Sequence, residues 1–334
     1  MGAMTEDSPD DLNSPAPEYE ISPDAGPDLA PEPEPPPPIR WPRAETAPEQ
    51  DIFGIPVPPS KTYPRHIPHL GHAALFFVIA LVLMIVGLLI GTVVVQSLHL
   101  YPHHGFDWIF HNAATDARTG IPIQTFSYGL IVLVCVPLFS LLWSEPFGEG
   151  VHWNNRAAWS QQRRFFSLVI LGLAAGTGIS LIGNLLPMPS NPPITQDMMK
   201  SAAGAWLLLI FGITAAPLIE ELAFRGFLLP GLLNAFRWFA DRGILPAGAP
   251  TWIGIPFSIA VTSLAFAFMH SPQVSHAWGP LVLIGSVSIV LCIVRLAMNS
   301  VMASVIVHAA YNFTLFAGVL YQTSGFRHLE RLKG

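Results

Sequence analysis

Seven long apolar segments constrain the fold of this 334-residue chain more than any other feature of its sequence. Each approaches the roughly 20 residues that an α-helix needs to cross the hydrocarbon core of a bilayer. The mean hydropathy is +0.47, and 11% of the residues are charged, against about 25% in ordinary soluble domains. The pattern predicts an all-α, polytopic transmembrane bundle of seven or eight helices. The segments lie at about 73–96, 125–143, 165–187, 203–224, 253–270, 278–298 and 300–320.

The N-terminal segment, residues 1–68, differs in composition from this apolar body. Residues 1–51 contain 13 of the 22 acidic residues, and residues 1–68 contain 18 of the 33 prolines. This composition predicts a disordered, acidic, partly polyproline-II tail, because few large apolar side chains are present to form a core. The tail is a possible docking site for a protein partner, although such tails are usually solvated linkers. Residues 69–160 are then expected to hold two transmembrane helices with their loops, and residues 161–325 the functional core.

The distribution of Lys and Arg predicts the orientation of the chain in a cell inner or plasma membrane. Lys61 and Arg65 precede the first span, whereas the loop after it contains Arg118 alone. Because basic loops stay on the cytoplasmic side, the N-terminus is expected to be cytoplasmic. Seven crossings would then place the basic C-terminal tail, 327–333, outside. An extra crossing or re-entrant piece at 226–240 would remove this conflict, so we favour eight helices.

Two adjacent glutamates, Glu220 and Glu221, interrupt the fourth apolar segment. A charged side chain at the centre of a membrane helix costs about 2.5 to 3.5 kcal/mol on insertion scales, so it persists mainly where partners or a reaction require it. Glu221 and Arg225 are four residues apart and share one helix face, whereas Glu220 is rotated by about 100°. We predict that Glu221 pairs with Arg225 and that Glu220 faces a neighbouring helix as the better general base. In the alternative, all three residues form an ion network for packing, which leaves one surplus buried charge.

Two further polar motifs lie on later helices. His270 follows Phe266 by four residues near a helix end, where a histidine also serves as a cap or an interfacial residue. His308 and Asn312 share one face of the last span, where interhelical hydrogen bonds worth about 1 kcal/mol are the structural alternative. We assign Arg295, at the end of the sixth span, a structural role, either extending to the interface or bonding helix-end carbonyls.

A helical bundle can bring polar groups from three such helices to one buried point. The set contains a carboxylate base, two imidazoles and neutral donors for an oxyanion, which suits hydrolysis by an activated water. We expect the Glu220 and His270 side chains to lie about 4 to 6 Å apart, across one water. The candidate catalytic residues are Glu220, Glu221, Arg225, His270, His308 and Asn312.

These residues resemble the motifs of the CAAX-protease and bacteriocin-processing family, also called the Abi family, of intramembrane endopeptidases. The family pattern EExxxR, FxxxH and HxxxN is met in order and without substitution, and the resemblance covers about residues 160–320. It implies a helical membrane bundle with a water-filled cavity in which a peptide bond is hydrolysed. It also implies that Glu221 and Arg225 hold Glu220 in place. The matching residues are Glu220, Glu221, Arg225, Phe266, His270, His308 and Asn312.

The resemblance further implies that Glu220 with His270 activates the water, while His308 with Asn312 forms the oxyanion site. A zinc ion held by Glu220, His270 and His308 is the alternative, since two histidines and one carboxylate bind zinc in soluble metalloproteases. The HExxH motif that usually builds such a site is absent from the sequence. We therefore favour a metal-free glutamate mechanism with no cofactor.

The expected partners are membrane lipid and a peptide or lipidated protein substrate of the CAAX type, with no nucleic acid. Two other classes of function remain open at this point. A transporter would also bury Glu, Arg and His, but it is expected to show two related halves with broken helices, which this sequence lacks. A non-catalytic immunity or scaffold protein would keep the motif residues and recruit a partner through its tail.

Overall fold

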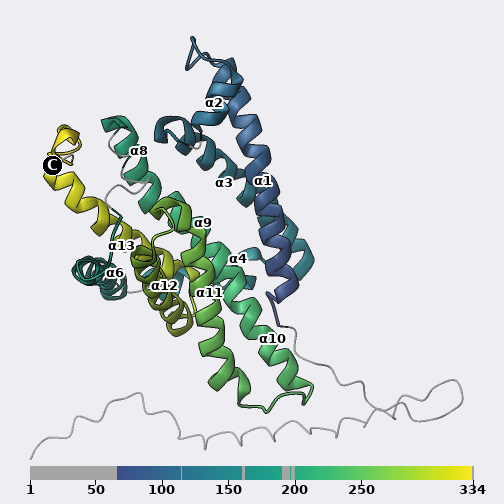
Figure 1. Ribbon diagram of the computed structural model, residues 1–334. Coiled ribbons are helices and arrows are strands. Elements are labelled where there is room, and N and C mark those ends of the chain that lie inside the picture. The colour runs from purple at the N-terminus through teal and green to yellow at the C-terminus, as the bar shows by residue number, and fades with distance from the viewer. Residues whose placement is uncertain (1–65, 114, 160–161, 190–195, 197–199, 333–334) are drawn as a thin grey trace, which may run out of the picture. The chain divides into compact units, whose positions relative to one another are not determined.

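The computed structural model describes a helical chain in which no strand occurs among the described residues (Figure 1). The predicted all-α class is therefore confirmed. The N-terminal tail that we predicted to be disordered, with Lys61 and Arg65, lies outside the described residues, apart from its last three. The structure describes residues 66–113, 115–159, 162–189, 196 and 200–332.

The helices form three groups. The α-helices are α1 (Leu70–Ser97), α2 (Phe106–Asn112), α3 (Ala117–Trp143), α4 (Phe147–Gly150), α5 (Asn155–Trp159), α6 (Gln162–Gly183), α8 (Ala202–Ile213), α9 (Ala215–Glu221), α10 (Leu229–Asp241), α11 (Ile255–Met269), α12 (Trp278–Met298) and α13 (Val301–Gln322). Two π-helical segments are η1 (Leu222–Leu228) and η2 (Pro250–Gly254). Two 3₁₀ turns are η3 (Ser271–Val274) and η4 (Leu329–Leu332).

Seven helical segments within the described residues are long and apolar enough to cross a membrane, which makes the chain a multi-pass membrane protein. The eighth crossing that we favoured at 226–240 is not among them. These residues instead continue one helical rod of 40 residues, Ala202–Asp241, which runs through α8, α9, η1 and α10 (Figure 1). At 1.5 Å per residue the rod would extend about 60 Å, twice the roughly 30 Å of hydrocarbon. It is therefore a single long element and supplies no return crossing.

Pro217 interrupts this rod between α8 and α9. A proline ring clashes with the carbonyl four residues earlier, which here belongs to Ile213, the last residue of α8. Thr214 follows with φ −127° and ψ −85°, outside helical geometry. The break therefore has a local cause in the sequence, and it lies six residues before Glu220.

Pro230 follows the π-helical segment η1. The amide of Leu229 donates to the carbonyl of Phe224, five residues earlier, as π-helical geometry requires. In the same register residue 230 would donate to the carbonyl of Arg225. Proline has no N–H group, so this carbonyl lacks its backbone donor.

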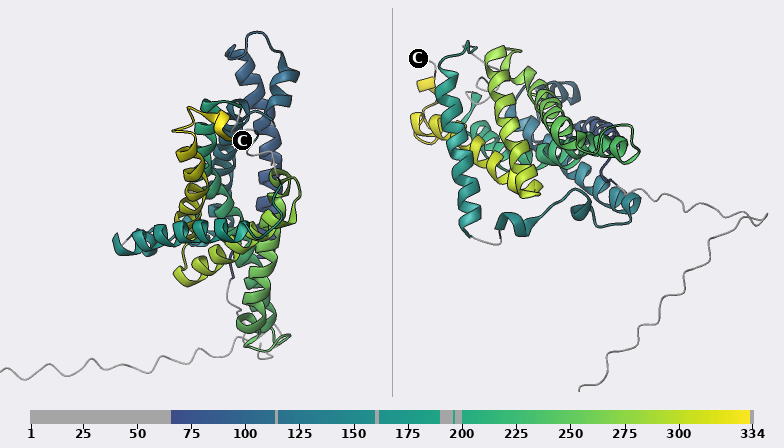
Figure 2. Two further views of the ribbon diagram at one scale, coloured as in Figure 1. Left: turned by 60° about the vertical axis from the view of Figure 1, so that its left-hand side comes forward. Right: turned by 90° about the horizontal axis from the view of Figure 1, so that it is seen from below.

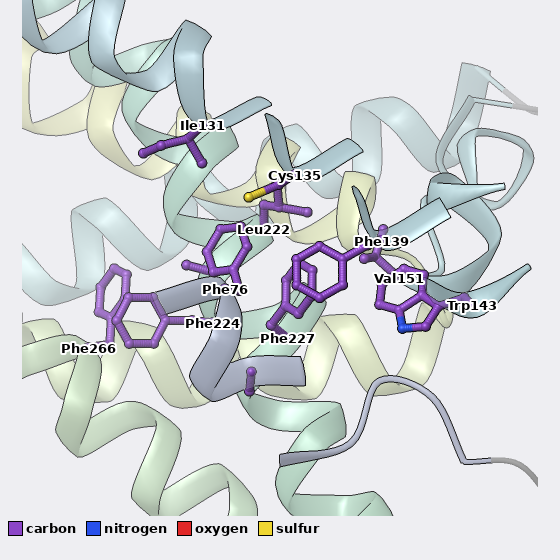
Figure 3. Packing of buried hydrophobic residues seen from close by; sticks show 12 residues of the cluster. Phe76, Ile131, Cys135, Phe139, Trp143, Val151, Leu222, Phe224, Phe227 and Phe266 are labelled. Atoms are coloured by element: carbon purple, nitrogen blue, oxygen red, sulfur yellow. The ribbon is translucent and has the colours of Figure 1, made fainter. Parts of the chain in front are cut away.

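An aromatic cluster fixes η1 against the N-terminal helices. Phe227 of η1 stacks on Phe76 of α1 at 4.4 Å between ring centroids and lies 4.7 Å from Phe139 of α3. Figure 3 shows these rings side by side, with Phe224 facing Phe266 of α11 on the other side of the cluster. Helices outside the predicted core therefore support the segment that carries Arg225.

Helix α6 packs closely on α13 and crosses the direction of α10 (Figure 2). The contact depends on glycines. A Cβ atom at Gly172 would lie 2.4 Å from the carbonyl oxygen of Val307, and one at Gly176 would lie 2.6 Å from Thr314. Small residues allow two membrane helices to approach this closely. This contact supports α13, the helix that carries two of the predicted site residues.

Candidate active site

The 202–241 rod carries the acidic pair and Arg225 at the junction of α9 and η1. Glu220 and Glu221 are the last two residues of α9, and Arg225 lies in η1. The Glu221 and Arg225 side chains are both 0% exposed, and Arg225 Nη1 donates to Glu221 Oε1 at 2.8 Å. The predicted Glu221–Arg225 pair is therefore present. It is fully removed from water.

Glu221 also contacts His308 of α13, which sequence spacing did not predict. His308 Nδ1 lies 2.9 Å from the same Oε1 atom of Glu221. An ionised carboxylate only accepts hydrogen bonds, so the Nδ1–H group donates to it. This contact orients the His308 ring and directs its Nε2 atom away from Glu221. Glu221 therefore supports an imidazole as well as Arg225.

Both histidines direct Nε2 toward Glu220. The distance from Glu220 Oε2 is 3.6 Å to His270 Nε2 and 3.8 Å to His308 Nε2. In His270, which caps the end of α11, Nδ1 donates to the Phe266 carbonyl at 2.8 Å. The Glu220–His270 distance is shorter than the expected 4 to 6 Å, so a bridging water would lie beside the line joining the two atoms. The Glu220 side chain is 13% exposed, in contrast to the fully buried Glu221.

Phe266 is the centre of the aromatic contacts in the site. The Arg225 guanidinium lies 4.7 Å from its ring centroid, a cation–π distance. Its ring centroid is 4.6 Å from that of His270 and 5.7 Å from that of His308. The sequence showed only that Phe266 lies four residues before His270 and completes the FxxxH motif. The structure places Phe266 against three of the site's polar side chains, which explains why a large apolar ring suits this position.

Asn312 occupies a different position from the other five candidates. Its Nδ2 atom donates to the carbonyl of Gly212 at 2.6 Å, next to the break that Pro217 causes. Within the described chain, no hydrogen bond joins Asn312 to Glu220 or His270. It lies one turn from His308 on α13, as its spacing predicted. The structure therefore brings five candidates together directly and attaches the sixth to the adjacent helix end.

Arg295 bonds backbone carbonyls, one of the two roles we predicted for it. It does not extend to the interface, because it is 4% exposed and its guanidinium contacts the carbonyls of Arg225 and Val151. Its contact with the carbonyl of Arg225 in η1 was not predicted. The signal in the sequence was Pro230, which leaves the Arg225 carbonyl without a donor.

Zinc would require three or four ligands at about 2.0 to 2.3 Å in tetrahedral geometry. Across the described residues, no group of three or more His, Cys, Asp or Glu side chains is arranged to hold a metal ion. Glu220, His270 and His308 approach one another without forming such a set. The steps proposed below use these side chains alone, and none of them depends on a metal.

Comparison with protein families identifies the segment that carries the site. Residues 202–314 match the family described as Type II CAAX prenyl endopeptidase Rce1-like. No curated protein and no solved structure matches the chain. The match confirms the resemblance found in the motifs and includes all six candidate residues, although it is shorter than the 160–320 expected. It supports a protease of the CAAX type.

Proposed function

We propose that this chain, whose residues 202–314 carry the CAAX-endopeptidase-like segment, is an intramembrane endopeptidase that hydrolyses a peptide bond in a hydrophobic or lipidated, CAAX-like substrate. One observation carries the proposal. The Nε2 atoms of His270 and His308, from two different helices, both lie within 3.8 Å of one carboxylate oxygen of Glu220. Ionisable side chains are costly in membrane helices. Packing alone therefore does not explain why these three side chains converge.

In the proposed mechanism Glu220 is the general base. A water held against Glu220 Oε2 and His270 Nε2 loses a proton to the carboxylate, and its oxygen bonds to the scissile carbonyl carbon. The carbon–nitrogen bond then breaks, and the leaving nitrogen takes the proton from Glu220. The products are a carboxylic acid and an amine, and transfer of the acid's proton to the amine gives a carboxylate and an ammonium group. His270 keeps its Nε2 atom toward the water because its Nδ1–H is bound by the Phe266 carbonyl.

His308 is proposed as the main donor to the oxyanion. When the ring is protonated, Nδ1–H remains on Glu221 and Nε2–H is directed toward Glu220, where the substrate carbonyl would lie. The Glu221 carboxylate accepts from Nδ1–H and fixes the orientation of the ring, as the buried aspartate does for the histidine of serine proteases. Asn312 uses one amide proton on Gly212, and the second proton of the same nitrogen is available to the oxyanion.

The site segment also favours a substrate that enters from the bilayer. Glu220 lies within a rod whose hydropathy suits hydrocarbon, so a peptide that reaches it must tolerate an apolar path. A lipid anchor or an apolar side chain near the scissile bond would hold the substrate at the required depth. This is the chemistry that a CAAX-like substrate offers, and membrane lipid is the surrounding medium.

The proposal is tested with the full-length protein purified in detergent and a quenched peptide carrying a farnesylated CAAX sequence. Glu220→Ala and Glu220→Gln should lower kcat by about 10³-fold or more, because the base is lost. Glu330→Gln, which changes an exposed carboxyl far from the site in sequence, is the matched control and should keep full turnover. Full turnover by Glu220→Gln would contradict the enzyme mechanism proposed above.

The same assay separates the two other classes of function. A scaffold or immunity protein would bind the peptide without cleaving it, so product would be absent for the wild type as well as for Glu220→Ala. A transporter would show flux in proteoliposomes without hydrolysis. Hydrolysis that depends on Glu220 is expected only for the endopeptidase.

A further inference from the structure

Arg295 of α12 belongs to none of the three motifs, yet each of its three guanidinium nitrogens donates a hydrogen bond next to the site. Nε donates to the Arg225 carbonyl at 3.2 Å, and Nη2 donates to the Val151 carbonyl at 3.4 Å. Nη1 donates to Asn299 Oδ1 at 3.1 Å. One side chain therefore joins α12 to η1 and to the loop after α4. Such a buried cation is expensive in a membrane protein and calls for a cause.

The cause lies in the helical register of η1. Leu229 N–H donates to Phe224, so the next donor in the ladder would be residue 230, a proline. The Arg225 carbonyl would therefore be buried without a partner, at a cost of about 1 to 3 kcal/mol. Arg295 Nε supplies the missing donor. The contact is specific to the backbone of the residue that pairs with Glu221.

The formal charges of the site support the same role. Sequence spacing alone left Glu220 and Glu221 with one arginine, a surplus of one negative charge. Arg295 adds a second buried cation, so two carboxylates are balanced by two guanidinium groups. Its charge is also felt in the adjacent loop, where burial and the charges of Arg295 and Arg237 lower the pKa of His152.

We propose that Arg295 is a positioning residue for the hydrolytic site: it holds the Arg225 carbonyl that Pro230 leaves without a donor, and so fixes the Arg225–Glu221–His308 series. The links are Arg295 Nε to the Arg225 carbonyl, Arg225 Nη1 to Glu221 Oε1, and His308 Nδ1 to the same Oε1. His308 Nε2 then lies against Glu220. The inference rests on the endopeptidase function proposed above, and Arg295 touches no reacting atom.

The decisive variants are Arg295→Met, Pro230→Ala and the two combined. Arg295→Met removes the donors while keeping an apolar stem of similar length. It should lower kcat by about 10- to 100-fold with KM changed less than about threefold, because a displacement near 1 Å costs up to about 10² in rate. Pro230→Ala gives residue 230 an N–H group for the Arg225 carbonyl. Alone it should leave kcat within about threefold, and in the Arg295→Met background it should raise kcat at least about fivefold.

Asn299→Ala is the matched control, since it removes a contact of Arg295 that does not involve η1. It should leave kcat within about threefold. Arg295→Lys keeps the charge but not the Nε geometry, and it replaces Arg295→Met if that variant does not fold. It is also measured together with Pro230→Ala. Restoration by Pro230→Ala is expected in either background.

Two results would overturn the inference. One is an Arg295→Met or Arg295→Lys variant with wild-type kcat. The other is a loss of kcat that Pro230→Ala leaves unchanged, which would mean that Arg295 acts through its charge or through folding alone. Glu220→Ala is measured in parallel. If it retains turnover, the proposed function fails, whereas a failure confined to the Arg295 variants leaves that function intact.

Discussion

Replacing Glu221 by Gln tests the site at the residue that contacts both Arg225 and His308. Glu221 is 0% exposed, and one oxygen atom accepts from Arg225 Nη1 at 2.8 Å and from His308 Nδ1 at 2.9 Å. The substitution keeps the shape of the side chain and removes its charge. We expect it to affect both stability and turnover, for different reasons.

The stability loss follows from the unpaired charge on Arg225. Hydrogen bonds to charged groups contribute about 1.5 to 3 kcal/mol each, so the two contacts together amount to about 3 to 6 kcal/mol. Breaking a buried ion pair from one side costs about 3 to 5 kcal/mol by the same reasoning. The combined variant Glu221→Gln with Arg225→Met should recover part of this loss, because no buried charge is left without a partner.

Turnover should fall and should not recover in the combined variant. Without the carboxylate, the Nδ1–H group of His308 loses its charged acceptor, and the ring loses its orientation. An amide in place of the triad aspartate of a serine protease lowers kcat by about 10⁴. Because His308 is proposed here as an oxyanion donor and not as the base, we expect a loss of about 10² to 10³, the effect of removing one such donor.

The assay is cleavage of the farnesylated peptide in detergent, with thermal unfolding of the same samples followed by a thiol-reactive dye. Glu330→Gln is the control for loss of a carboxylate elsewhere. A Glu221→Gln protein with kcat within about threefold of wild type would refute the role of the Glu221–His308 contact. Equal recovery of stability and of kcat in the combined variant would show that Glu221 serves folding alone.

Three further predictions concern other parts of the structure. Asn312→Ala should lower kcat by about 10- to 1,000-fold in peptide cleavage with little change in KM. A variant with wild-type kcat would contradict the role of Asn312 as an oxyanion donor. Gly172→Ala should lower the free energy of unfolding by about 1 to 3 kcal/mol, because its Cβ would lie 2.4 Å from the Val307 carbonyl oxygen. The loss is measured as a lower unfolding temperature in detergent. Gly178→Ala, which meets nothing within 4 Å, should be neutral or slightly stabilising, and equal effects at both glycines would contradict the packing argument. Peptide cleavage should survive prolonged treatment with strong chelators, and stoichiometric zinc in the active protein by elemental analysis would favour the metal alternative.

Local spacing predicted the parts of the site that depend on one helix. The i, i+4 relation predicted the Glu221–Arg225 pair, and the different phase of Glu220 predicted that it would face other helices. Apolar length predicted the helical class and the seven spans. These features depend on helix periodicity and on the thickness of the bilayer, both of which can be applied to a sequence without knowing its fold.

Contacts between distant helices could not be predicted in the same way. The Glu221–His308 hydrogen bond joins residues 87 positions apart, and the Arg295–Arg225 contact joins residues 70 apart. Such contacts depend on how α12 and α13 pack on the rod, for which spacing gives no information. The extra crossing at 226–240 was predicted from charges alone, and the structure continues the rod there because π-helical geometry tolerates Pro230 without a turn.

Two prolines explain how this membrane rod accommodates a hydrolytic site. Pro217 and Pro230 lie on either side of the acidic pair, and each disturbs the backbone ladder near one carbonyl, that of Gly212 or that of Arg225. Irregular backbone is tolerated at membrane depth only where other parts of the protein satisfy it. Side chains from α12 and α13 do this here: Asn312 of α13 donates to Gly212, and Arg295 of α12 donates to Arg225. The helix that repairs the first break also carries His308, so satisfying the broken backbone and bringing an imidazole to Glu220 require the same packing. A regular helix at 214–229 would need neither donor. The hydrogen bond from Asn312 to Gly212 would then not hold α13 where His308 meets the acidic pair.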